Sequence, residues 1–316
     1  MPFLTITGAT GFVGRAACTE AVARRRDVRA VTRAACDMSP GIDHVVVGNI
    51  DGATEWGPSL VNCDVLVHLA ARVHVMRESS ADPLGSFRRV NVEGTLNLAR
   101  QAAAAGVRRF VFVSSIKVNG EATPPGKPFS ESDAPLPADA YGVSKLEAEQ
   151  GLRELAVRTG MEVTIIRPPL VYGPGVKANF AALLGAIQKG RLLPLGAVQN
   201  LRSFVAIDNL VDFIFTCADH PLAANETFFV SDGHDLSTPG LVHGLARAAG
   251  VSARVPSVPL WALQAGAALL GKRDALERLC GNLQLDISKA RHVLDWAPPL
   301  GVADALQQTV AGRKGS

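Results

Sequence analysis

Apolar runs of strand length alternate with stretches of helical spacing along the first half of the chain. The runs are apolar at nearly every position, which is typical of parallel strands covered on both faces of a sheet. We expect strands at residues 3–7, 28–32, 44–47, 64–69, 109–114 and 162–167. Apolar positions at helical spacing occur at residues 12–24, 93–105 and 141–157. This alternation predicts an α/β fold with a doubly wound parallel sheet and right-handed crossovers.

Helix stops and strand ends indicate where a site is to be expected. Gly106 and Gly160 follow the second and third predicted helices and are suited to end them. Ligands of doubly wound sheets bind at the carboxyl ends of the strands. The residues directly after each strand are therefore the first candidates for a functional site.

The first strand ends in a glycine-rich turn that opens a helix. The turn has the pattern G-x-x-G-x-x-G, one residue longer than the commonest dinucleotide fingerprint. Glycines permit the tight turn and a close approach of phosphates, while the helix dipole favours a pyrophosphate. A turn kept glycine-rich only for steric reasons is the alternative. The predicted cofactor contacts of this Rossmann-type site are Gly8, Thr10, Gly11, Phe12, Val13 and Gly14.

The ends of the next strands extend the predicted cofactor site. Arg33 follows the second strand, where Asp or Glu would bond the ribose 2′-hydroxyl of NAD and an arginine can meet the 2′-phosphate of NADP. We favour NADP(H), with NAD and a merely exposed arginine as alternatives. Asn49 and Ile50 follow the third strand and are predicted to contact the adenine. The small residues that let the cofactor lie close to the fourth strand are Leu69, Ala70 and Ala71.

A serine, a tyrosine and a lysine form the candidate catalytic group. Ser115 follows the fifth strand, and Tyr141 and Lys145 share one helix face because they are four residues apart. An ammonium close to a phenol favours the phenolate, so we expect Lys145 to lower the pKa of Tyr141 towards the range of a general acid–base. Ser115 would hold the substrate oxygen. A Tyr-x-x-x-Lys pair on an exposed helix without a catalytic role is the alternative.

Composition narrows the class of protein. The chain has 316 residues, 47% hydrophobic and 19% charged, which fits a globular enzyme with a large core and a smaller lobe. The net charge of +3 without a Lys/Arg block argues against nucleic-acid binding. Five scattered cysteines without C-x-x-C spacing predict reduced thiols, a cytoplasmic protein and no metal site.

The most apolar run spans residues 258–270. It is interrupted by Pro259, Gln264 and Gly266 and is shorter than the roughly 20 residues that a membrane span needs. We also expect no signal peptide, because residue 3 already begins the first strand. The run predicts a core helix, or a helix that lines a substrate lobe or a subunit contact.

Taken together, these motifs resemble the extended short-chain dehydrogenase/reductase family, in its branch of nucleotide-sugar epimerases and dehydratases. The resemblance extends from about residue 3 to about residue 310. Its carriers are the glycine motif, Ser114-Ser115, the Tyr141 and Lys145 pair, and the segments 167–175, 202–208 and 286–290.

The resemblance assigns roles to individual residues. It implies that Ser115, Tyr141 and Lys145 are a catalytic triad, and that Val113 and Pro168 contact the cofactor. It implies a UDP-sugar substrate, with Arg202 at the diphosphate, which suits a guanidinium. A helix cap is the alternative role for Asn179. The substrate contacts that it implies are Ser115, Lys117, Asn179, Arg202 and Arg278.

The resemblance also implies a division into two parts and a homodimer. Residues 1–171 plus 201–230 would form the dinucleotide-binding domain, and residues 172–200 plus 231–312 a sugar-nucleotide lobe. Helices at residues 93–105 and 141–157 would form the subunit contact.

Two positions depart from the family pattern. Related 4,6-dehydratases carry an Asp-Glu pair where this chain has Ile116 and Lys117, so we do not expect dehydratase activity. Arg33 replaces the acidic ribose ligand usual in NAD-retaining 4-epimerases. Residues 114–121 and 269–279 are similar to bacterial enzymes of surface-polysaccharide synthesis, above all to 4-ketoreductases that form UDP-N-acetylquinovosamine.

Three functions follow from this reading. The leading hypothesis is an NAD(P)-dependent oxidoreductase that moves hydride at C4 of a UDP-sugar, as a UDP-4-keto-6-deoxy-N-acetylhexosamine 4-reductase. The alternative is a UDP-glucose or UDP-N-acetylglucosamine 4-epimerase with a retained cofactor. The third is a non-catalytic dinucleotide sensor with the same fold.

Overall fold

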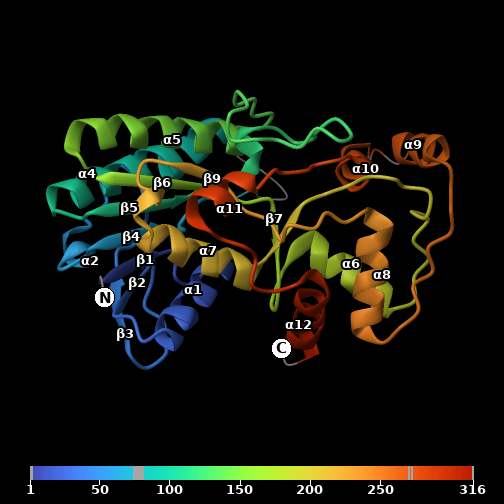
Figure 1. Cartoon of the computed structure of the whole chain (residues 1–316), viewed down its shortest axis with the longest axis horizontal. Helices are drawn as coiled ribbons and strands as arrows, with labels where there is room; N and C mark the ends of the chain where they lie inside the picture. Colours follow the sequence, from blue (N-terminus) through green and yellow to red (C-terminus); the bar gives the residue numbers. More distant parts are fainter. Residues whose placement is uncertain (1–2, 74–81, 270, 272, 315–316) are drawn as a thin grey trace.

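A seven-stranded parallel sheet forms the centre of the molecule (Figure 1). The computed structural model describes residues 3–73, 82–269, 271 and 273–314. The strand order is β3-β2-β1-β4-β5-β6-β9, so the predicted doubly wound parallel sheet is confirmed. Its strands are β1 (Leu4–Thr7), β2 (Val28–Thr32), β3 (Ile42–Val46), β4 (Val65–His68), β5 (Arg109–Val113), β6 (Glu162–Arg167) and β9 (Thr227–Phe229).

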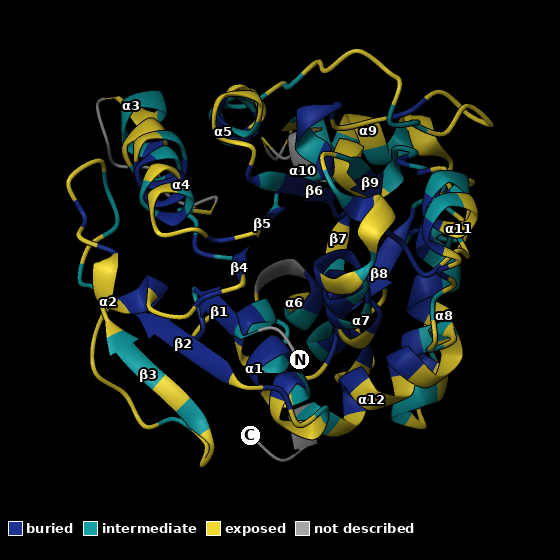
Figure 2. Cartoon of the chain, turned by 60° about the vertical axis from the view of Figure 1, so that its left-hand side comes forward, coloured by how far each residue is buried: buried dark blue, intermediate teal, exposed yellow. Residues whose placement is uncertain are grey.

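Side chains of alternating strand positions supply a separate apolar core on each face. Val65 and Val67 of β4 belong to one core and Leu66 to the other, as the two-residue period of a strand requires. β3 at the sheet edge is only partly buried, whereas β2 beside it is fully buried (Figure 2). The covering helices are α1 (Phe12–Ala23) and α7 (Ile207–Asp219) on one face, and α4 (Thr95–Ala104) and α5 (Ala140–Thr159) on the other.

The helix predicted at residues 93–105 is confirmed as α4, but helical structure begins before it. A short α3 (Pro83–Arg88) continues through a π-helical turn at Arg89–Gly94 into α4. A Cβ at Gly94 would come within 2.7 Å of the Ile50 side chain, so glycine allows this turn to pack closely. The other two predicted helices are confirmed. Shorter helical segments are α2 (Gly57–Leu60), η2 (Ile116–Val118) and η3 (Pro221–Ala223).

A second group of elements packs beside the sheet around a third apolar core (Figure 1). The Tyr172 hydroxyl donates to Asp232 at 2.7 Å, and the Asn209 side chain of α7 donates to the same carboxylate, which ties both parts together. The domain boundaries stay a prediction, although β8 pairs with β7 and not with the large sheet. The elements are β7 (Leu170–Tyr172), β8 (Phe204–Ala206), α6 (Ala178–Gln188), α8 (Thr238–Ala249) and α12 (Val302–Lys314). α11 (Ser288–Leu294) belongs to the core on the α1 and α7 face of the sheet and packs against β9 and η3.

The apolar run at residues 258–270 forms α9 (Leu260–Leu269), which is not a core helix. No residue of α9 is buried, and Trp261 is 73% exposed. The core prediction is wrong because α9 lies at the rim of the molecule and packs mainly against α10 (Arg273–Cys280) (Figure 1). The alternatives, that this helix lines a substrate lobe or a subunit contact, stay predictions. Within the described ranges, no helix has the length and apolarity to cross a membrane.

Candidate active site

The predicted cofactor residues lie at one edge of the sheet, because they follow the carboxyl ends of its parallel strands. They come from six adjacent strands. The glycine turn follows β1, Arg33 follows β2, and Asn49 and Ile50 follow β3. Residues 69–71 follow β4. Val113 ends β5, and Pro168 comes directly after β6.

The glycine turn has the geometry that a dinucleotide needs. Gly8 has a φ of +69°, and a Cβ there would lie 2.7 Å from the Ala70 backbone nitrogen. A Cβ at Gly14 would lie 2.1 Å from the Gly8 carbonyl oxygen. Gly11 is the N-cap of α1 and supplies no side-chain acceptor to the first N–H groups of the helix. These N–H groups are suited to a pyrophosphate, so the residues present fit the predicted cofactor.

A buried histidine supports the loop after β4. The Thr7 hydroxyl accepts from the Leu69 and Ala70 backbone N–H groups and lies 2.7 Å from His68 Nδ1. Because this hydroxyl already accepts twice, its proton goes to Nδ1, and His68 Nε2–H donates to Thr95 Oγ1 at 3.0 Å. Burial and, to a smaller extent, the Lys145 ammonium lower the pKa of His68 to about 3. The ring is therefore neutral and holds the loop in place.

Other predicted cofactor residues differ in their surroundings. The Arg33 side chain is exposed. Ile50 packs against Gly94 in the π-helical turn, and its contact with an adenine stays a prediction. The Pro168 carbonyl accepts from the Ile116 N–H at 3.0 Å, which places Pro168 beside the segment that carries Ser115.

Ser115, Tyr141 and Lys145 come together at the carboxyl end of β5. Lys145 Nζ donates to the Val113 carbonyl at 2.9 Å and lies 4.3 Å from the centre of the Phe112 ring. Ser115 is the second residue after this strand, and its Oγ accepts from the Lys117 backbone N–H at 3.3 Å. Tyr141 lies in the first turn of α5, one turn before Lys145. The fold thus brings the three predicted residues to one place.

The electrostatics of this group differ from expectation. Burial lowers the pKa of Lys145 to about 7, although Glu149 one turn further along acts in the opposite direction. Burial raises the pKa of Tyr141, and the Asp139 carboxylate raises it further. The expectation of a lowered tyrosine pKa is therefore wrong for this structure. Desolvation of the phenol outweighs the charge of a lysine that is itself buried.

A buried ionic network lies behind Ser115. Glu149 of α5 is 1% exposed and Arg167 of β6 is 3% exposed. Arg167 Nε donates to Glu149 Oε1 at 2.9 Å, and the Ser114 hydroxyl donates to the same oxygen at 2.6 Å. Arg167 also donates to the Asn119 side chain at 2.8 Å. The network fixes the strand end that carries Ser115 against the helix that carries Lys145.

Sequence reasoning missed this network. Glu149 lies four residues after Lys145, so it continues the same helix face as Tyr141. This four-residue spacing is the sequence signal from which a role for Glu149 beside Lys145 could have been predicted. Arg167, by contrast, ends β6 after two isoleucines, and a cation at a strand end does not reveal its partner.

Lys117 and Asp139 form an ion pair between the catalytic segments. The Lys117 ammonium contacts the Asp139 carboxylate and lies 2.9 Å from Glu121 Oε1. Asp139 Oδ1 accepts from the Gly142 N–H at 2.7 Å and so caps α5. The Lys117 ammonium is engaged by both carboxylates. The predicted contact of Lys117 with the substrate stays a prediction.

Two of the predicted substrate residues, Arg202 and Arg278, lie at or next to α10. Arg202 Nη1 donates to the Gly281 carbonyl at 2.9 Å, and burial lowers the pKa of this arginine. Arg278 is exposed on α10. Asn179 lies in the first turn of α6, but its side chain is outside the described part of the structure.

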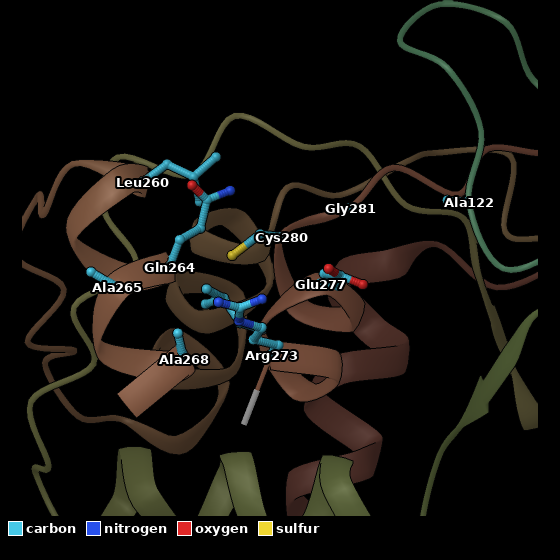
Figure 3. Close-up of a pocket in the computed structure, with 10 residues that line it drawn as sticks. Ala122, Leu260, Gln264, Ala265, Ala268, Arg273, Glu277, Cys280 and Gly281 are labelled. Atoms are coloured by element: carbon cyan, nitrogen blue, oxygen red, sulfur yellow. The ribbon is translucent and has the colours of Figure 1, made fainter. Parts of the chain in front are cut away.

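A pocket of about 650 Å³ opens between α9 and α10, next to Arg202 (Figure 3). Gln264, Arg273 and Cys280 point into the space between the two helices. Gly281, which accepts from Arg202, belongs to its wall. The lining residues are Ala122, Leu260, Gln264, Ala265, Ala268, Arg273, Leu276, Glu277, Cys280 and Gly281.

Residues 4–230 match the NAD dependent epimerase/dehydratase family, and the chain belongs to this family of enzymes. The prediction of a short-chain dehydrogenase/reductase of the nucleotide-sugar branch is confirmed. The prediction of a nicotinamide dinucleotide cofactor is confirmed as well. The cofactor of the family is NAD, which supports the NAD alternative over the favoured NADP(H).

Several of the relatives are epimerases. The UDP-glucose 4-epimerase of Vibrio cholerae is 48% identical over 309 residues, which are 97% of this chain and 94% of the relative. UDP-N-acetylglucosamine 4-epimerase from Bacillus cereus has the same fold, with a TM-score of 0.80 at 20% identity over 100% of both chains. UDP-glucose 4-epimerase from Thermotoga maritima, solved with UDP-glucose, has a TM-score of 0.79 at 21% identity over 99% and 98% of the chains. These findings favour the 4-epimerase alternative over the 4-reductase hypothesis.

Proposed function

We propose that the protein is a UDP-hexose 4-epimerase. The observation that carries the proposal is the 48% identity to a UDP-glucose 4-epimerase over nearly the whole of both chains. The position of Ser115, Tyr141 and Lys145 at the end of β5, on the same edge of the sheet as the glycine turn, supports it, because these are the groups that proton transfer at a sugar hydroxyl requires.

In the proposed reaction, this chain moves one proton and orients one oxygen. Tyr141 takes the proton from the 4-hydroxyl of the sugar and later returns it to the 4-keto oxygen. Ser115 donates a hydrogen bond to that oxygen. Lys145 holds the nicotinamide ribose and favours the phenolate of Tyr141. Bound NAD supplies the hydride acceptor at C4, and its positive ring opposes the effect of burial on the Tyr141 pKa.

The sugar nucleotide would span the two parts of the molecule. Arg202 is suited to the diphosphate because its guanidinium is fixed by the Gly281 carbonyl and is otherwise available for charge-assisted bonds to phosphate. The pocket between α9 and α10 adjoins this guanidinium. We place the nucleoside end of the substrate on this side and the hexose towards Tyr141.

Filling this pocket tests the placement. Ala268→Trp puts a large side chain into the pocket wall and is expected to raise KM for UDP-glucose about tenfold, with kcat changed by less than about threefold. Steady-state kinetics measure both. Ala267→Trp is the matched control, because Ala267 lies on α9 outside the lining set. Equal KM values for the two variants would place the nucleoside elsewhere.

The proposed activity is tested with the purified protein and UDP-glucose deuterated at C4, without added cofactor. We expect UDP-galactose to form and to keep the deuterium at C4, because the hydride returns to the sugar from which it came. Nuclear magnetic resonance detects product and label together. UDP-N-acetylglucosamine deuterated at C4 is tested in parallel. If neither substrate is converted, with or without added NAD, the proposal is wrong.

The 4-reductase is the second candidate because of one observation. Arg33 stands at the end of β2, where its exposed guanidinium can meet the 2′-phosphate of an exchanging NADPH. Oxidation of NADPH by UDP-4-keto-6-deoxy-N-acetylglucosamine, in equal amounts, would support the reductase. Conversion of UDP-hexoses without cofactor supports the epimerase.

A further inference from the structure

An unusual cation stands between the two segments that carry the candidate catalytic residues. Lys117 comes two residues after Ser115, and Asp139 comes two residues before Tyr141. The Lys117 ammonium contacts the Asp139 carboxylate, with Glu121 as its second partner at 2.9 Å. Both carboxylates raise the pKa of Lys117 against the effect of burial, so the side chain is charged.

The backbone holds this ion pair in a fixed place. The Leu136 N–H donates to the Val118 carbonyl at 3.0 Å, which joins the loop before α5 to η2. A Cβ on Gly142 would lie 2.7 Å from the Lys117 carbonyl oxygen, so η2 and the first turn of α5 are in close contact. Asp139 is also fixed as the N-cap of α5. The pair therefore cannot move far from Tyr141.

Among the described residues, Asp139 is the carboxylate that acts on the pKa of Tyr141. A carboxylate beside a phenol disfavours the phenolate. Lys145 lies one turn further along α5, and the ring of Phe87 in α3 packs edge-on against Tyr141 at 6.0 Å. The Arg72 guanidinium lies over the Phe87 ring, and the Arg88–Glu147 ion pair joins α3 to α5. These groups are the same in every variant considered below.

We propose that Lys117 is a positioning residue whose ammonium neutralises the Asp139 carboxylate beside Tyr141 and thereby controls how readily the phenol releases its proton. The proposal rests on the proposed function, because it takes Tyr141 as the acid–base group. Lys117 acts through Asp139 and does not itself touch the reacting atoms. Lys117 stands where related dehydratases carry an acidic residue. An acid–base group is therefore replaced at this position by a cation that acts on Asp139.

Removing the positive charge of Lys117 and removing the negative charge of Asp139 test the proposal, because the two changes are expected to shift the apparent pKa of the reaction in opposite directions. Lys117→Met removes one cation from the Asp139 carboxylate and is expected to move the apparent pKa in the pH profile of kcat up by about one unit. Asp139→Asn keeps an N-cap residue but removes the negative charge, and is expected to move this apparent pKa down by a similar amount. The double variant has neither charge and is expected to lie near the wild type. Lys117→Arg restores the charge and the wild-type profile.

A second readout does not depend on turnover. The chain has only two tyrosines, and the pKa of Tyr172 is strongly raised by burial and by Asp232. Tyrosinate absorbance of the NAD-loaded protein therefore reports Tyr141, with Tyr141→Phe as the blank. At one alkaline pH the ionised fraction is expected to rise from Lys117→Met through the wild type to Asp139→Asn. Glu121→Gln, which removes the other carboxylate of Lys117, is the matched control with a smaller shift.

The outcomes separate the two proposals. If all variants are folded and active with one common pH profile and one tyrosinate fraction, Lys117 has no such role. If the wild type does not convert UDP-hexoses, the proposed function fails, whereas the ordering of tyrosinate fractions still tests the electrostatic role of Lys117.

Discussion

Replacing Tyr141 with Phe is expected to lower kcat for UDP-hexose conversion by about 10²- to 10⁴-fold, the range usual for loss of a positioned acid–base group. The reason is that the phenol is the group placed to exchange a proton with the sugar oxygen. The substitution removes one hydroxyl and keeps the ring, so the edge-on contact with Phe87 at 6.0 Å is retained. The fold and the glycine turn are not touched.

The measurement pairs kinetics with cofactor binding. The affinity for the cofactor, measured by the fluorescence of bound NADH, is expected to change less than about threefold. A contact made only in the transition state affects kcat and not the binding of the ground state. Tyr172→Phe is the matched control. Its hydroxyl donates to Asp232 in the second part of the molecule, so its loss is expected to affect stability and not kcat. A Tyr141→Phe enzyme that keeps more than a tenth of the wild-type kcat would remove the phenol from the reaction.

The sheet and the glycine turn could be predicted because each is encoded locally. A buried parallel strand must be apolar at nearly every position, and residues 65–67 and 110–113 satisfy this without reference to the rest of the chain. Gly8 and Gly14 are required by contacts within their own turn and with the next strand. The spacing of Tyr141 and Lys145 likewise fixes their shared helix face. Local rules therefore gave both the fold and the position of the site.

The protonation chemistry could not be predicted in the same way. The pKa of Tyr141 depends on how deeply the first turn of α5 is buried and on the Asp139 charge, and both follow from the packing of η2 and α3 against that turn. The pairing of Glu149 with Arg167 depends on how α5 crosses β6. The exposure of Trp261 depends on the absence of a covering element in the described part of the chain. Each of these is a property of tertiary structure.

Glu149→Gln is expected to lower the free energy of unfolding by about 3–5 kcal/mol, the usual cost of removing one partner of a buried ion pair. Arg167 is then left charged in an apolar surrounding, with its remaining side-chain bond to Asn119. The Ser114 hydroxyl loses a charged acceptor at the same time. Urea denaturation followed by circular dichroism measures the loss.

The same helix provides the matched control. Glu147 lies two residues earlier in α5 and pairs with Arg88, whose side chain is 47% exposed, so Glu147→Gln is expected to have a small effect on stability. The double variant Glu149→Leu/Arg167→Met removes both charges together and is expected to recover much of the lost stability, because no buried charge remains unpaired. Its kcat is nevertheless expected to stay low, since Glu149 also supports the charge on Lys145. Equal losses in Glu149→Gln and Glu147→Gln would mean that the network behind Ser115 contributes no more than a surface pair, and that Ser115 is held in place by the sheet alone.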